Sequence, residues 1–205
     1  MASDLILYRP IVIIRTMNTM RDQIIAATSV LLERQGYYAT GLNQIVQASG
    51  APKGSLYYYF PAGKEELTAE AIERSSRLLA AHTRTELGAV ADPAEAVRQF
   101  IRNLAVHVQA SDCRSGAPIA AVALETAAAS DRLAAACGAA YARLHDVFRD
   151  KLVLGGIAPE RAASLATLIV AAIEGGIVLT RAHRSAAPLE QIADELHRVL
   201  DAKTG

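Results

Sequence analysis

Residues 40–67 read TGLNQIVQASGAPKGSLYYYFPAGKEEL, and this stretch decides the fold. Residues 42–49 leave room for two turns of helix before Gly50, and residues 52–59 for two more before Pro61. A glycine turn between two short helices sets the second helix across the first, which is the geometry of a helix-turn-helix. The stretch therefore predicts a helix pair whose second member can enter the major groove of a duplex.

The charge pattern around this helix pair favours contact with a polyanion. No Asp or Glu lies between Glu33 and Glu65, whereas Arg34, Lys53 and Lys64 lie inside that window. Over the whole chain 21 basic residues balance 21 acidic ones, so no global field attracts nucleic acid. Composition and spacing alone leave two interpretations open, a DNA reader and a surface helical hairpin with a solvated face.

Several side chains in the window can donate hydrogen bonds to phosphate oxygens or reach base edges. Three consecutive tyrosines on a short helix spread over about 200 degrees of arc, so at least one hydroxyl must face solvent or a ligand. Gly54 allows close approach of the backbone to DNA, and Lys53 supplies a positive charge. The predicted DNA-binding residues are Thr40, Gly41, Gln44, Pro52, Lys53, Gly54, Ser55, Tyr57, Tyr58, Tyr59 and Lys64.

The remainder of the chain predicts helices only. Apolar residues make up 52% of the sequence, aromatics only 5%, and the apolar positions recur three and four apart rather than alternating. The fold class is therefore all-α, with a three-helix N-terminal helix-turn-helix domain followed by a bundle of roughly six longer helices. We expect residues 1–17 to be a loose arm or a mis-assigned start, and the two domains to span residues 18–66 and 67–205.

No catalytic or metal-binding motif interrupts this pattern. The sequence contains no GxSxG, HExxH or GxGxxG, GAPKGS lacks the spacing of a P-loop, and Cys113 and Cys137 form no zinc-spaced cluster. Two cysteines are too few for a secreted disulfide scaffold, and the apolar residues 5–14 lack the features of a signal peptide. We therefore expect a cytoplasmic protein that is not an enzyme and needs no cofactor or metal.

The stretch from Thr40 to Leu67 resembles the signature of TetR-family transcriptional regulators, over about residues 18–78. The segments PKGS (52–55), FPAGKEEL (60–67) and GAPIAAVALE (116–125) are similar to the LmrA/YxaF-like subgroup. The resemblance implies a homodimeric, ligand-responsive regulator, in most cases a repressor. It would bind a palindromic DNA operator and be released by a small hydrophobic or aromatic effector.

The resemblance also implies roles for single residues. Phosphate contacts fall on Thr40, Lys53, Tyr57, Tyr58 and Lys64, and base contacts fall on Gln44, Pro52 and Ser55. Three positions depart from the residues common in the family, namely Gly41, Val46 and Tyr59.

An effector pocket is expected in the C-terminal half, where apolar walls carry a few polar groups. The candidates are Phe100, Leu104, His107, Cys113, Val122, Glu125, Tyr141, His145 and Phe148. Each could instead belong to the core, and a partly exposed, satisfied histidine is the commoner interpretation of His107 and His145. Glu125 interrupts an apolar run, so it needs a partner, either Arg114 or a ligand hydroxyl.

The penultimate and last helices are expected to form a dimer interface. Its candidates are Glu174, Gly175, Leu179, Arg181 and Leu196. Residues 162–180 approach the length of a membrane helix, yet Glu174 and the neighbouring glycine pair favour a buried or interface helix. The alternative to a regulator is a helical small-molecule carrier or interaction module that does not bind DNA.

Overall fold

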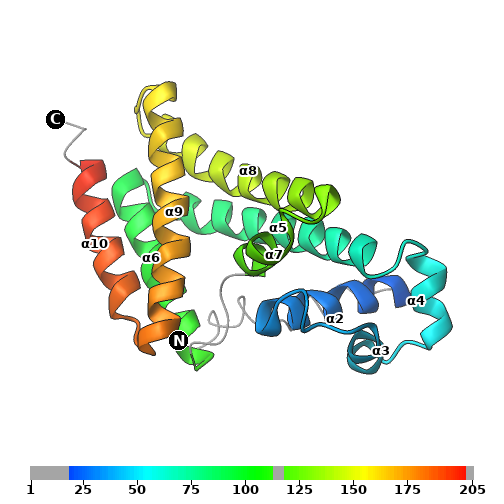
Figure 1. Cartoon of the computed structure of the whole chain (residues 1–205). Coiled ribbons are helices and arrows are strands. Elements are labelled where there is room, and N and C mark those ends of the chain that lie inside the picture. Colours follow the sequence, from blue (N-terminus) through cyan, green and yellow to red (C-terminus); the bar gives the residue numbers. More distant parts are fainter. Residues whose placement is uncertain (1–18, 113–117, 202–205) are drawn as a thin grey trace. The chain divides into compact units, whose positions relative to one another are not determined.

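The structure, a computed structural model, describes residues 19–112 and 118–201 (Figure 1). Within those ranges the chain forms nine α-helices and no strand, which confirms the all-α prediction. The expected N-terminal arm, residues 1–17, and Cys113 lie outside the described residues. The helices are α2 (Met20–Gln35), α3 (Leu42–Ser49), α4 (Lys53–Tyr59), α5 (Lys64–Gly88), α6 (Pro93–Ala110), α7 (Pro118–Thr126), α8 (Asp131–Leu154), α9 (Pro159–His183) and α10 (Ala187–Asp201).

The described helices form two compact units, and these do not follow the expected linear boundary at residue 66. Residues 19–75 join residues 118–138 in the first unit, and residues 76–112 join residues 139–201 in the second. Helices α5 and α8 each contribute residues to both units. Helix α7 therefore belongs with the helix-turn-helix, although the sequence places it deep in the C-terminal half.

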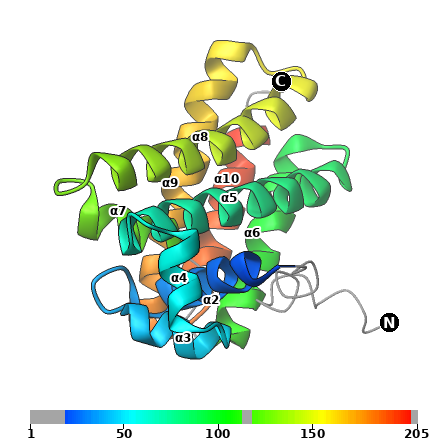
Figure 2. The same ribbon diagram turned by 90° about the vertical axis from the view of Figure 1, so that its right-hand side faces the viewer.

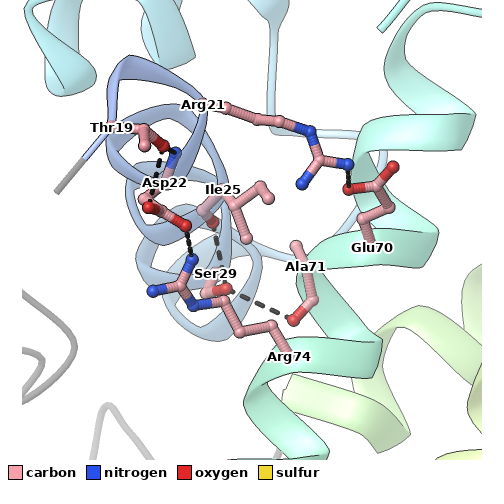
Figure 3. A network of polar contacts seen from close by, with 8 residues as sticks. All are labelled: Thr19, Arg21, Asp22, Ile25, Ser29, Glu70, Ala71 and Arg74. Carbon is pink, nitrogen blue, oxygen red and sulfur yellow. Dashed lines mark hydrogen bonds and ion pairs between the residues drawn. The ribbon is translucent and has the colours of Figure 1, made fainter. Parts of the chain in front are cut away.

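In the first unit, α2 begins where its sequence provides a cap and is fixed along the start of α5. The Thr19 hydroxyl accepts a hydrogen bond from the Asp22 backbone N–H, and the apolar face of α2 is buried. Two ion pairs, Arg21 with Glu70 and Arg74 with Asp22, join α2 to α5 (Figure 3). These contacts hold α2 as the support on which α3 and α4 rest.

In the second unit, α6, α9 and α10 pack against one another. Asp92 caps the start of α6, because its carboxylate accepts a hydrogen bond of 2.6 Å from the Glu95 backbone N–H. Gly176 of α9 lies so close to α10 that a Cβ there would stand 2.6 Å from Leu189 Cδ2 and 2.8 Å from Ile192 Cδ1. The glycine therefore permits close packing of two helices within one protomer.

Candidate nucleic-acid interface

Helices α3 and α4 form the predicted helix pair around a left-handed glycine (Figure 2). Gly50 ends α3 with φ 68° and ψ 8°, a conformation that costs glycine little and other residues more. Ile45 of α3 and Leu56 of α4 are almost fully buried. Each short helix thus packs into the core of the first unit through one large apolar side chain, and its opposite face remains exposed.

The exposed surface of this helix pair carries the side chains that the sequence predicted for DNA. Tyr58 is 80% exposed and Tyr57 is 50% exposed, and Lys53 and Gly54 are also exposed. This confirms that the three consecutive tyrosines cannot all be buried. Pro52, Gly41 and Gln44 are exposed as well, whereas Ser55 and Tyr59 are half-buried.

Gln44 has a structural contact in addition to its exposed position. Its side-chain oxygen accepts hydrogen bonds from the Gly41 backbone N–H at 2.8 Å and from Gln35 Nε2 at 3.1 Å. These contacts cap the start of α3, and the Gln44 amide nitrogen is not used by either of them. An amide nitrogen is one of the two groups by which Gln reads adenine.

Thr40 corrects the expectation that its hydroxyl contacts phosphate. The side chain is fully buried, and its hydroxyl donates to the Gly36 carbonyl oxygen at 2.6 Å. The Thr40 backbone N–H is also engaged, because it donates to the Tyr37 carbonyl oxygen at 3.1 Å. Thr40 therefore stabilises the turn between α2 and α3 from inside.

Lys64 lies at the start of α5 and is half-buried. Its ammonium nitrogen stands 4.0 Å from the centre of the Tyr37 ring, within the range of a cation–π contact. Burial lowers the pKa of Lys64, and the nearby charge of Glu125 opposes that shift. Lys64 thus rests on an aromatic face and lies close enough to Glu125 of α7 for the carboxylate charge to act on it.

The predicted effector residues divide between the two units. Phe100, Leu104, His107, Tyr141, His145 and Phe148 belong to the second unit, whereas Val122 and Glu125 belong to the first. The rings of Phe100 and Phe148 meet edge to face with centroids 5.5 Å apart. Val122 is fully buried, and the Glu125 carboxylate accepts a hydrogen bond from the Tyr38 backbone N–H at 2.8 Å. No local sequence pattern pairs Tyr38 with Glu125, which lies 87 residues further along the chain.

Polar groups inside the second unit carry shifted pKa values. Burial lowers the pKa of His107, and the charge of His82 lowers it further. Burial raises the pKa of Glu174, although a hydrogen bond from Tyr141 partly opposes the shift. His145 contacts the Ala163 carbonyl oxygen through Nε2 at 2.9 Å, as expected for a satisfied histidine.

A depression of about 240 Å³ in the second unit is lined by Arg77, Ala80, Arg84, Arg143 and Asp146. None of these five residues was among the predicted effector contacts. The sequence signal that could have found them is the spacing of Arg77 and Arg84, which are two helical turns apart on α5.

The predicted dimer residues also differ in accessibility. Gly175 and Leu179 are exposed on α9, Leu179 to 47%, and Arg181 and Glu174 are half-buried. Leu196 of α10 corrects the expectation, because it is only 5% exposed and packs within its own protomer. Cys137 is buried, and burial raises the pKa of its thiol, so it behaves as a small apolar side chain.

Comparison with known proteins identifies both halves of the chain. Residues 24–71 match the profile of bacterial regulatory proteins of the tetR family, and residues 93–195 match the C-terminal domain of LmrA/YxaF-like transcriptional regulators. The chain belongs to the TetR family of transcriptional regulators. The subgroup resemblance is confirmed by the same profile, and the family consists of regulators rather than enzymes.

Two relatives from Bacillus subtilis match most of this regulator. It is 39% identical to the HTH-type transcriptional regulator LmrA over 84% of this chain and 92% of the relative. It is 40% identical to the uncharacterized HTH-type transcriptional regulator YxaF over 86% and 92% of the two chains. A TetR regulator from Legionella pneumophila shares the fold with a TM-score of 0.78, at 19% identity over 90% of this chain and 98% of that one.

Proposed function

We propose that this regulator is a repressor that binds a palindromic operator as a homodimer and releases it when a small hydrophobic or aromatic effector binds. The observation that carries the proposal is the exposed face of α4, where Lys53, Tyr57 and Tyr58 stand on a stretch without acidic residues. Basic and tyrosine side chains of this kind neutralise and hydrogen-bond phosphates. Helix α4 would enter the major groove, and Gln44 of α3 would lie near its edge.

The surface of α9 supports the homodimer. Between residues 168 and 182 its exposed positions repeat three and four apart, and all of them are apolar or small: Leu168, Ala171, Gly175, Val178, Leu179 and Ala182. Within residues 19–112 and 118–201, α9 is the helix long and apolar enough to cross a membrane. A second copy of the chain would cover this stripe, as expected for a coiled-coil-like seam between helices.

A homodimer accounts for the palindromic form of the proposed operator. Adjacent major grooves on one face of DNA lie about 34 to 36 Å apart, so a dimer with two helix-turn-helix heads matches two half-sites. A change of several ångströms in the separation of the heads would remove phosphate contacts at both half-sites. Effector and operator binding would then oppose each other through one coupling free energy, equal in both directions.

The effector is proposed from the chemistry of the second unit. Phe100, Leu104 and Phe148 are buried apolar side chains, and His107 and Tyr141 are half-buried polar ones. A planar hydrophobic molecule with a few hydroxyl groups suits such a lining. Regulators of this family are normally cytoplasmic, and we place this one there.

Selection of bound duplexes from a random DNA pool tests the proposal, followed by a screen for molecules that release the selected duplex. A palindromic consensus bound by a dimer is the expected result. A chain that binds small hydrophobic molecules but no duplex at low salt would be a helical carrier, and the repressor proposal would fall. An effector that tightens operator binding would refute simple repression.

A further inference from the structure

Glu125 connects α7 to the turn that leads into the DNA-reading helices. Its Oε2 accepts a hydrogen bond of 2.8 Å from the backbone N–H of Tyr38, in the turn between α2 and α3. Its Oε1 lies 2.0 Å from the point where a Cβ on Gly36 would stand. Gly36 also has φ 77°, a backbone conformation that favours glycine, and the carboxylate fills the space that a Cβ would take.

The contact continues from this turn to α3 through a chain of hydrogen bonds. Gln35 Nε2 donates to the Ala39 carbonyl oxygen at 2.7 Å and to Gln44 Oε1 at 3.1 Å. The Thr40 hydroxyl closes the turn on Gly36 from the buried side. The Glu125 carboxylate therefore fixes one end of a short polar network, and the proposed base-reading residue Gln44 lies at the other.

The charge of Glu125 has a separate effect on the same surface. Lys64, a proposed phosphate contact, lies near enough to feel the carboxylate, and its ammonium group already rests on the Tyr37 ring. A negative charge beside this lysine reduces the positive potential offered to DNA. The hydrogen bond thus favours DNA binding by ordering the turn, whereas the charge opposes it.

We propose that Glu125, a residue of α7 far from the helix-turn-helix in sequence, is a positioning residue for operator binding. Its acceptor oxygen holds the α2–α3 turn in the form that places α3 and α4, and its charge moderates the attraction of Lys64 for phosphate. This role rests on the proposed function. The hydrogen bond from Tyr38 to Glu125 also joins α7 to the DNA-binding helices, so that any displacement of α7 would move or free the α2–α3 turn.

Two substitutions separate the acceptor from the charge. Glu125→Gln keeps an oxygen that can accept from Tyr38 and removes the charge, whereas Glu125→Ala removes both. Alanine is the better helix former, so loss of α7 would not explain a defect. Leu124→Ala is the matched control, because Leu124 neighbours Glu125 on α7 and is 86% exposed.

Operator affinity is measured by fluorescence anisotropy on dimers of the full chain, with unfolding curves recorded in parallel. We expect Glu125→Ala to weaken binding about tenfold relative to Glu125→Gln. Glu125→Gln should bind about two to three times more tightly than wild type at low salt, and the difference should shrink as salt screens the charge. If Glu125 had a merely structural role, replacing it by glutamine would not tighten operator binding in this way. Leu124→Ala should bind as wild type.

Equal operator affinities of Glu125→Ala and Glu125→Gln would overturn the proposal. If Glu125→Ala does not fold, amide exchange decides. Tyr38 is 66% exposed, so slow exchange of its N–H in wild type and in Glu125→Gln supports the hydrogen bond, and fast exchange refutes it. A wild-type chain that binds no duplex would refute the proposed function itself. Tight binding that Glu125→Ala leaves unchanged would refute this role alone.

Discussion

Replacing Lys53 by Gln tests the proposed docking of α4 on DNA through its dependence on salt. Lys53 is exposed in the first turn of α4, where the helix dipole disfavours a cation, so its removal should not lower the stability of the fold. A dimer on two half-sites loses one phosphate contact at each. Each contact contributes about 0.9 to the slope of log K against log salt, so the slope should fall in magnitude by about 1.8.

That change in slope corresponds to a large change in the relative DNA affinities of wild type and Lys53→Gln. Between 50 and 200 mM salt, a fourfold change, the affinity gap between wild type and Lys53→Gln should narrow by about twelvefold. Anisotropy titrations of the selected operator across this range measure it. Arg132→Gln, which removes an exposed cation on α8 of the same unit, is the control and should leave the slope unchanged. An affinity loss in Lys53→Gln with an unchanged slope would refute a phosphate contact at this residue.

Four further substitutions test the packing of the helices, three in the second unit and one, Gly138→Ala, in the first. Phe148→Ala should lower the free energy of unfolding by about 3 to 5 kcal/mol in urea titrations, because the side chain is fully buried against Phe100. Gly176→Ala should destabilise by about 1 kcal/mol through its contact with α10, whereas Gly138→Ala, with open space around it, should stabilise by about 1 kcal/mol. Glu174→Gln should stabilise by about 1 kcal/mol at pH 7, because burial raises the pKa of the carboxyl and Oε2 has no partner among the described residues. Below pH 4.5 Glu174 is protonated in both the folded and the unfolded state, so wild type and Glu174→Gln should be equally stable there. As pH rises through the folded-state pKa of Glu174, wild type should lose stability and the variant should not.

The helix boundaries that the sequence predicted well are those set by residues acting on their own backbone. Gly50 ends α3, as expected, and Pro93 begins α6 directly after the Asp92 cap. Residues 127–129 are alanines, which by propensity alone would continue α7 beyond Thr126. In the structure the Thr126 carbonyl accepts from the N–H of Ser130, whose hydroxyl then caps α8 by accepting from the N–H of Leu133. The Ser130-Asp131 pair was the sequence signal for this break.

Two site residues make hydrogen bonds that their residue types did not predict, one within a local turn and one to a distant part of the chain. Thr40 has the residue type of a phosphate contact, but its hydroxyl is turned inward to Gly36. Glu125 is an acid in an apolar run, and its partner lies 87 residues away in the chain. No local pattern distinguishes a carboxylate facing a ligand from one facing a backbone N–H of another helix turn. Only the packing of α7 in the first unit makes that distinction.

An electrically balanced chain can still attract DNA, because only nearby charges count at physiological salt. The screening length is about 10 Å at 0.1 M, so charges farther from α4 than this contribute little there. The acids nearest in sequence are engaged within their own unit, Glu66 with the Ala62 backbone N–H at 2.9 Å and Glu65 with the Ser130 hydroxyl. Lys53 therefore faces solvent without a competing carboxylate between residues 34 and 64. The uneven distribution of charge along the chain, rather than its net charge, gives the helix pair a positive potential that attracts phosphate.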